Sequence, residues 1–251
     1  MTDKFTVDLF CKTRDQQALC GLSSELKSIL IDELDKTQSA IAKTIVKQLT
    51  SSQYRFDNVE YNKNIVFQFY SKSKDVNPGF GAGEKIPQND IKRFTKLAKL
   101  KDWRKVLSNF YVAPFILDGL HWSSVEHFYQ GSKFKCTNYN YYKQFSLDSG
   151  SELSKDPYMA KSGGGKTGKI KGKQFRPIDV QIDPNFEASG SKELAMYRGQ
   201  MAKYSQNELP RQVLLLTSDA MLTHFSRGQP PVVFYNTMCI RSFLSKSLKN
   251  E

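Results

Sequence analysis

Residues 121–134 read His-Trp-Ser-Ser-Val-Glu-His-Phe-Tyr-Gln-Gly-Ser-Lys-Phe and carry two stripes at helical spacing. Ser123 is a favoured helix N-cap residue, so we expect a helix to begin near it. The stripe that can pack inward consists of Val125, Phe128, Tyr129, Ser132 and Cys136. Glu126, Gln130 and Lys133 form the second, polar stripe. Seven residues separate Glu126 and Lys133 by about 10 Å along the axis, which leaves room for a ligand the size of a sugar.

Two flanking segments predict strands and one predicts a loop. Residues 64–70 are β-branched and aromatic, which is typical of a buried strand. Residues 114–119 predict a short strand that ends in an Asp-Gly turn. Residues 77–83 hold one proline and three glycines, which forbid regular structure.

Two further segments predict helices. Residues 191–206 have apolar side chains at steps of three and four behind Ser191, a plausible cap. Residues 209–216 predict another helix, because Pro210 is tolerated in a first turn. Because helices outnumber strands and no regular βαβ alternation is visible, we expect an α+β, helix-rich single domain over residues 61–251.

Residues 1–60 predict a separate N-terminal helical extension. Between Leu22 and Leu49 the apolar residues recur at steps of three, four or seven, with polar residues between them. The apolar stripe needs a covering surface. Two possibilities remain open, the body of this chain and a groove of a partner protein.

The net charge is concentrated in the C-terminal three quarters of the chain. The 251 residues carry 37 Lys+Arg and 25 Asp+Glu, a formal charge of +12, and 12% of them are aromatic. Residues 1–60 hold eight basic and nine acidic residues, so residues 61–251 hold 29 and 16, a net charge of +13. This composition supports a sizeable core, excludes a disordered tail and indicates phosphate-bearing partners.

The cysteine spacing indicates neither a zinc site nor a disulfide framework, and we expect reduced thiols. The four residues, which form no C-x-x-C pair, are Cys11, Cys20, Cys136 and Cys239. The sequence has no apolar stretch long enough for a membrane span and no signal-peptide h-region near its first residue. These features predict a soluble protein of the cytoplasm or nucleus.

Residues 160–167, Ala-Lys-Ser-Gly-Gly-Gly-Lys-Thr, come within one residue of the P-loop pattern. A P-loop needs a hydrophobic strand before it and a helix after it, and the flanking residues favour neither. We therefore reject a P-loop. Residues 155–176 still hold seven basic residues opposed only by Asp156. They form either a flexible loop whose amides bind phosphate or nucleic acid, or a solvated surface loop.

Glu126 has two interpretations on spacing alone. Ser123-x-x-Glu126 is a capping box, in which the carboxylate bonds to the Ser123 amide. The alternative is an acid/base group beside an anion or electrophile. His127 is equally typical of a hydrogen-bonded interior residue, and Lys133 of a solvated helix end. No cluster at metal-ligand spacing and no G-x-S-x-G motif is present, so we expect neither a metal site nor a serine hydrolase.

Several segments, in order, resemble the NADAR, or YbiA-like, family over roughly residues 64–244. They are Phe69-Tyr70, Leu107–Phe110, Pro114-Phe115, Asp118-Gly119, Trp122–Gln130, Lys133-Phe134, Arg176-Pro177, Met201–Asn207, Leu214–Ala220 and Met238–Arg241. Two departures stand out. The family's tryptophan-glycine motif is replaced by Arg227–Phe234, and residues 71–102 are an insert relative to compact bacterial members.

The resemblance implies an N-glycosidase that hydrolyses the bond between ribose C1 and a nitrogen, without a cofactor. Two phosphorylated substrates are implied, ADP-ribose attached to guanine in nucleic acid and early ribosylaminopyrimidine phosphates of riboflavin synthesis. A non-catalytic module that binds ADP-ribose or nucleic acid is the alternative, supported by the basic, aromatic body. The oligomeric state is left open.

The site residues follow from this resemblance. We expect Glu126 to stabilise the oxocarbenium ion or to activate water. Lys133 either binds the ribose or phosphate or attacks C1 to give an imine, and Asp219 is a second acid/base or ribose-binding group. The expected substrate-binding residues are Asn109 and Trp122, which orient and stack the ligand, Arg176 and Lys203, which bind phosphate, and Phe110, His127 and Gln130.

Overall fold

The computed structural model describes residues 59–187 and 191–247. The predicted N-terminal extension therefore lies, apart from its last two residues, outside the described residues. Within the described part the chain is a mixed α+β structure of helices and a few short strands, which confirms the predicted fold class. No helix of this part is long and apolar enough to cross a membrane.

The first of two halves of the structure combines segments from both ends of the described chain. It is built on two parallel strands, β1 (Asn62–Phe69) and β6 (Ala220–His224). Strand β7 (Val232–Val233) extends this sheet antiparallel to β6. The predicted strand at 64–70 is confirmed, and its side chains at Ile65, Phe67 and Phe69 are fully buried.

Helical elements complete the core of this half. They are η1 (Gln88–Phe94), α5 (Thr95–Ala98), α6 (Trp103–Leu107), α12 (Glu208–Leu216) and α13 (Tyr235–Ser247). Phe94 and Trp103 pack edge-on against Phe67, at centroid distances of 4.9 and 5.1 Å. The burial of these rings fixes α6 over β1.

The second half holds a hairpin and a group of short helices. Its elements are β2 (Phe115–Leu117), β3 (Leu120–Trp122), α7 (Val125–Ser132), α8 (Tyr139–Lys143), η2 (Leu147–Ser149), α9 (Glu152–Lys155), α10 (Pro157–Gly163), β4 (Lys169–Ile170) and β5 (Lys173–Gln174). The predicted Asp-Gly turn joins β2 and β3, with positive φ angles of 56° at Asp118 and 73° at Gly119. The Asp118 carboxylate accepts hydrogen bonds from Lys135 and Arg198.

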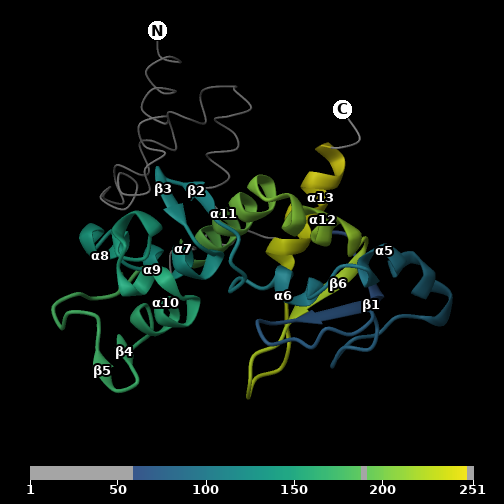
Figure 1. Cartoon of the computed structure of the whole chain (residues 1–251), viewed down its shortest axis with the longest axis horizontal. Helices are drawn as coiled ribbons and strands as arrows, with labels where there is room; N and C mark the ends of the chain where they lie inside the picture. The colour runs from purple at the N-terminus through teal and green to yellow at the C-terminus, as the bar shows by residue number, and fades with distance from the viewer. Residues whose placement is uncertain (1–58, 188–190, 248–251) are drawn as a thin grey trace, which may run out of the picture.

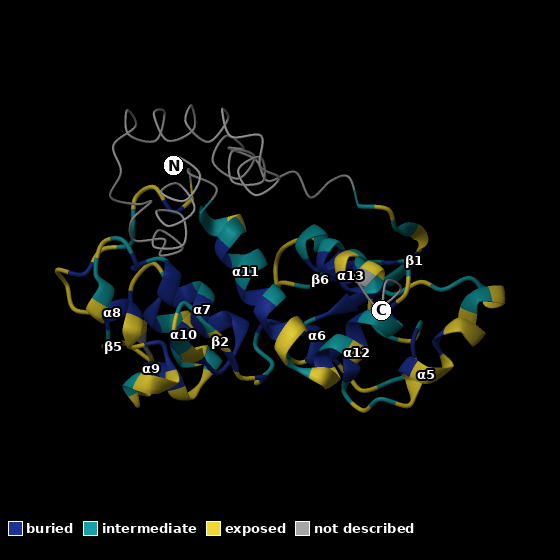
Figure 2. Cartoon of the chain, turned by 90° about the horizontal axis from the view of Figure 1, so that it is seen from above, coloured by how far each residue is buried: buried dark blue, intermediate teal, exposed yellow. Residues whose placement is uncertain are grey.

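Helix α11 (Ser191–Gln206) lies between the two halves, as both views show (Figures 1 and 2). Its Ala195 and Ala202 belong to the core of the second half, and its Tyr204 to the core of the first. The predicted helices at 191–206 and 209–216 are both confirmed. One prediction is wrong, because Cys136 is disulfide-bonded rather than a reduced thiol.

Candidate active site

Helix α7 begins one residue later than the capping-box interpretation requires. Its N-cap is Ser124, whose hydroxyl lies 2.8 Å from His127 Nδ1. The Glu126 amide donates instead to the backbone carbonyl of Asn109, at 3.0 Å. The Glu126 carboxylate accepts from Gln130 Nε2 at 2.8 Å and makes no bond to Ser123. The capping-box interpretation is therefore wrong, and the Glu126 carboxylate belongs to the polar stripe of α7.

The Glu126 carboxylate is buried, and few interactions offset its desolvation. Only 6% of the residue is exposed, and no cation of the described chain lies within ion-pair distance of it. Burial raises the pKa of Glu126, because it penalises the charged form, while the Gln130 hydrogen bond and the charges of Lys161 and Lys133 oppose the shift. Such a group can hold or release a proton at higher pH than an ordinary glutamate, which suits acid/base chemistry.

Two lysines flank this carboxylate from different elements. Lys133, at the end of α7, donates to the Gly164 carbonyl at 3.1 Å and is half-buried. Burial lowers the pKa of Lys133, and the charge of Glu126 partly restores it. Lys161 of α10 is exposed, and its Nζ lies 5.5 Å from the ring centroid of Phe110. Together with Asn109, we call Glu126, Gln130, Lys133 and Lys161 the Glu126 site.

Aromatic side chains border the Glu126 site on its lysine side. The rings of Phe110 and Tyr158 lie 4.9 Å apart with a 55° tilt, and 45% of Tyr158 is exposed. Lys72 Nζ lies 5.6 Å from the Tyr158 centroid. Exposed aromatic faces beside lysines suit a base that carries phosphate.

The glycine run beside Gln130 is a turn whose backbone is extensively hydrogen-bonded. Its carbonyls at 163, 164 and 165 accept from Tyr141, Lys133 and Arg176, at 3.2, 3.1 and 2.9 Å. The amides of Gly164 and Gly165 are used within the turn. The expectation that free amides of this segment grip a phosphate is therefore wrong at these two positions.

Gly164 has a second, steric role. A Cβ built at this position would lie 2.4 Å from Gln130 Oε1, so any side chain would displace Gln130. Gln130 Oε1 is buried and has no hydrogen-bond partner in the described chain. An acceptor left unpaired beside Glu126 is available to a ligand hydroxyl or a water.

Helix α11 holds the segment that carries Asn109. Lys203 Nζ donates to the carbonyls of Val106 and Ser108 at 2.6 and 2.8 Å. Gln200 Nε2 donates to Asn109 Oδ1 at 3.0 Å. Because the Asn109 carbonyl receives the Glu126 amide, α11 fixes the start of α7 through this segment.

Three predicted ligand contacts fall inside the protein. Trp122 is fully buried and donates its indole N–H to the Leu117 carbonyl, so we assign it to the core. His127 is fully buried, and burial lowers its pKa to about 4, which makes it neutral. Lys203 is also fully buried on backbone carbonyls and has no surface from which to bind a phosphate.

The remaining two predicted residues differ in their distance from the Glu126 site. Arg176 is 7% exposed, and its guanidinium donates to the carbonyls of Gly165 and Lys166, so it anchors the glycine turn. Asp219 pairs with Arg93 just before β6. The opposite end of β6 is His224, and the charge of Lys161, a residue of the Glu126 site, acts on it. A five-residue strand spans about 17 Å, and this length separates Asp219 from the end of β6 that is near the site. Asp219 thus lies away from Glu126.

The sequence interpretation missed two neighbours of the site. Tyr158 was passed over because its apolar neighbours form no helical stripe. His224 lies in β6, a strand that we did not predict. Burial lowers the pKa of His224 to about 4, and its ring stacks on Phe234 at 4.9 Å. No three or more His, Cys, Asp or Glu side chains of the described ranges gather as a metal site would require.

Comparison with known proteins gives one structural similarity. The NMR structure of the E. coli protein YbiA is 19% identical, and the match covers 77% of this chain and 93% of that chain with a TM-score of 0.45. No family model matches the chain. No curated protein matches it either.

Proposed function

We propose that this chain is an N-glycosidase of the NADAR type that hydrolyses the ribose C1–N bond of a phosphorylated ribosyl substrate. The single observation that carries the proposal is Glu126, a buried carboxylate with one amide donor and a raised pKa. Cleavage builds positive charge at C1, and an uncompensated carboxylate stabilises that charge more strongly than a salt-bridged one does. It can also take a proton from the attacking water.

The flanking groups support a substrate with a base and phosphate. Phe110 and Tyr158 offer aromatic faces for the base, and Lys161 and Lys72 lie over these rings. In this arrangement the ribose lies between the aromatic pair and Glu126, with Gln130 Oε1 as an acceptor for one of its hydroxyls. The two candidate substrates are ADP-ribosylated guanine in DNA and ribosylaminopyrimidine phosphate.

Lys133 has two possible roles within this proposal. Its ammonium can bind a ribose or phosphate oxygen. Alternatively, its amine can attack C1 as the C1–N bond breaks and the base leaves with a proton, after which the C1–ring-oxygen bond opens to give an imine. Because the pKa of Lys133 is lowered, a larger fraction of its amine is unprotonated than in a solvated lysine, and the unprotonated amine is the nucleophile. Borohydride added during turnover gives a covalent adduct at Lys133 only on the second route.

The deciding experiment is a release assay that offers both substrates to wild type, Glu126→Gln and Glu208→Gln. Glu208 is an exposed glutamate of α12 and serves as the matched control. We expect Glu126→Gln to fold normally and to lose about 10² or more in turnover, while the control retains the wild-type rate. Wild-type release by Glu126→Gln would refute the catalytic role.

A binding module without turnover is the second candidate. The exposed Tyr158 ring and the lysines beside it favour it, because they provide stacking and charge without any reacting group. Affinity for ADP-ribose or DNA with a steep salt dependence, combined with no product from either substrate, would establish this function instead.

A further inference from the structure

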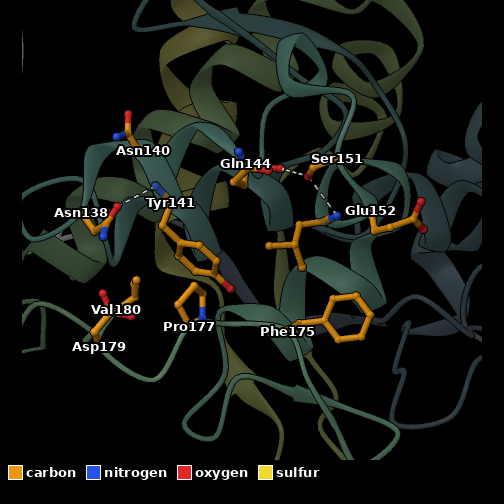
Figure 3. A pocket seen from close by; sticks show the side chains of 11 residues that line it. Asn138, Asn140, Tyr141, Gln144, Ser151, Glu152, Phe175, Pro177, Asp179 and Val180 are labelled. Atoms are coloured by element: carbon orange, nitrogen blue, oxygen red, sulfur yellow. Dashed lines mark hydrogen bonds between the residues drawn. The ribbon is translucent and has the colours of Figure 1, made fainter.

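A pocket of about 530 Å³ has a lining that shares no residue with the Glu126 site. Figure 3 shows the side chains that line it. The lining residues come from α8 and its two caps, Asn138 and Gln144, from Ser151–Leu153 and from 175–180. Its volume lies within the range of small-ligand sites. The pocket is open and is lined by both polar and apolar side chains, so its specificity must come from hydrogen bonds and flat surfaces.

Three side-chain amides lie on one side of this pocket, as Figure 3 shows. Asn138 Oδ1 caps α8 by accepting from the Tyr141 amide at 2.8 Å, which leaves its NH₂ group for a ligand. Asn140 and Gln144 are exposed, and their side-chain amides have no partner in the described chain. A carboxamide presents a donor and an acceptor side by side, which matches the edge of a nucleobase.

The opposite side supplies flat surfaces and positive charge. Phe175 and Pro177 form this wall, the Tyr141 ring of α8 points toward it (Figure 3), and Lys173 Nζ lies 5.6 Å from the Phe175 centroid. The β4–β5 hairpin and the residues before it expose further basic side chains, namely Lys166, Lys169 and Lys171. Two carboxylates also line the pocket. Glu152 is neutralised by Lys155 at 2.5 Å, and Asp179 is exposed.

We propose that this pocket binds a nucleobase whose phosphate lies on the lysines of the β4–β5 hairpin. The ligand is a mononucleotide or one unit of single-stranded nucleic acid, since both present the same base and phosphate. The proposed base site and the proposed glycosidase chemistry use different residues, because the lining of the pocket shares none with the Glu126 site.

The primary test is an NMR titration with AMP of wild type, Asn140→Ala/Gln144→Ala and the control Asn89→Ala/Gln212→Ala. The control removes two exposed amides from other surfaces. We expect AMP to shift the backbone amides of residues 138–144 and 175, and the pocket variant to weaken binding about tenfold or more. Absent shifts at millimolar AMP, or equal affinity in both variants, would overturn the proposal.

Two further titrations identify the ligand. Ribose 5-phosphate shifting the same amides as strongly as AMP would overturn the nucleobase assignment. If an oligo-dA binds more tightly than AMP and Lys171→Gln/Lys173→Gln abolishes this extra affinity, the ligand is single-stranded nucleic acid. If the oligo-dA and AMP bind with equal affinity, the ligand is a mononucleotide. Both of these outcomes support the base site. Glu126→Gln should leave all shifts unchanged, so failure of the glycosidase proposal is distinguishable from failure of this one.

Discussion

Two glutamates with buried carboxylates, Glu84 and Glu126, are held in opposite ways. The Glu84 side chain is 0% exposed, and both of its oxygens accept from Arg104, at 2.7 and 2.6 Å. The amides of Gly79 and Gly81 add two more donors at 3.0 and 3.1 Å. Glu126 has one neutral amide donor, from Gln130, and lysines beyond ion-pair distance.

The difference separates a carboxylate that holds a loop from one that is available for chemistry. Glu84 and Arg104 close the 76–84 segment, since Arg104 also donates to the carbonyls of Val76 and Asn77. Two guanidinium and two backbone N–H donors to one buried carboxylate offset its desolvation. The desolvation of the Glu126 carboxylate is offset only in part, by one amide donor. A carboxylate in this condition can stabilise a cation that appears only during a reaction.

The largest expected effect is on the stability of the Glu84 region. Glu84→Gln leaves the Arg104 guanidinium buried without its counter-charge, so we expect the free energy of unfolding to fall by about 3–5 kcal/mol. Urea denaturation monitored by circular dichroism measures it. A loss below about 1 kcal/mol would mean that the ion pair does not hold the loop.

The pH dependence of turnover tests the Glu126 region next. If the ionised carboxylate acts, release should fall about tenfold per pH unit below the pKa of Glu126, and this limb should lie above the ordinary value of 4.5. Rates measured from pH 4 to 8 on an uncharged leaving group give the profile. A limb at or below 4.5 would show that Glu126 is more solvated than its burial indicates.

Lys203 tests the support behind Asn109. Burial lowers its pKa from 10.5 to about 7, so between these values the unfolded chain binds more protons and stability rises with pH. Lys203→Met removes this slope and leaves two buried carbonyls unpaired, at a cost of about 1–3 kcal/mol. The difference between wild type and variant should widen from pH 7 to 10. Lys99→Met, at an exposed position, should leave the slope intact.

Long, regular elements were predictable from sequence, and contacts between distant segments were not. The helix at 191–206 was predicted from its periodicity and the strand at 64–70 from its β-branched and aromatic residues, and both are confirmed. Strand β6 was missed because its parallel partner β1 lies in a distant part of the sequence. Helices α8, α9 and α10 were missed because each is too short to show a periodic stripe.

The candidate site shows the same division. The polar stripe of α7 was predicted from spacing, and the Gln130–Glu126 bond follows it. The capping box failed by one residue, because Ser124 bonds His127 and the Asn109 carbonyl takes the Glu126 amide. The family resemblance predicted that Lys203 binds phosphate, and nothing in its local sequence indicates its full burial. Backbone carbonyls at the C-terminal end of α6, rather than neighbours along α11, determine its position.

The smallest expected effect has the opposite sign from that of Glu84→Gln. A raised pKa means that native Glu126 retains its proton to higher pH than the unfolded chain does, so its contribution to stability is lost as pH rises through the native pKa. Glu126→Gln carries no charge to bury and keeps a similar shape. We therefore expect it to be more stable than wild type at pH 7, by about 0.5–2 kcal/mol, with the gain vanishing toward pH 4. Denaturation midpoints of both proteins across this range measure the gain. A loss of stability at pH 7 would place Glu126 with Glu84, as a carboxylate that holds the fold.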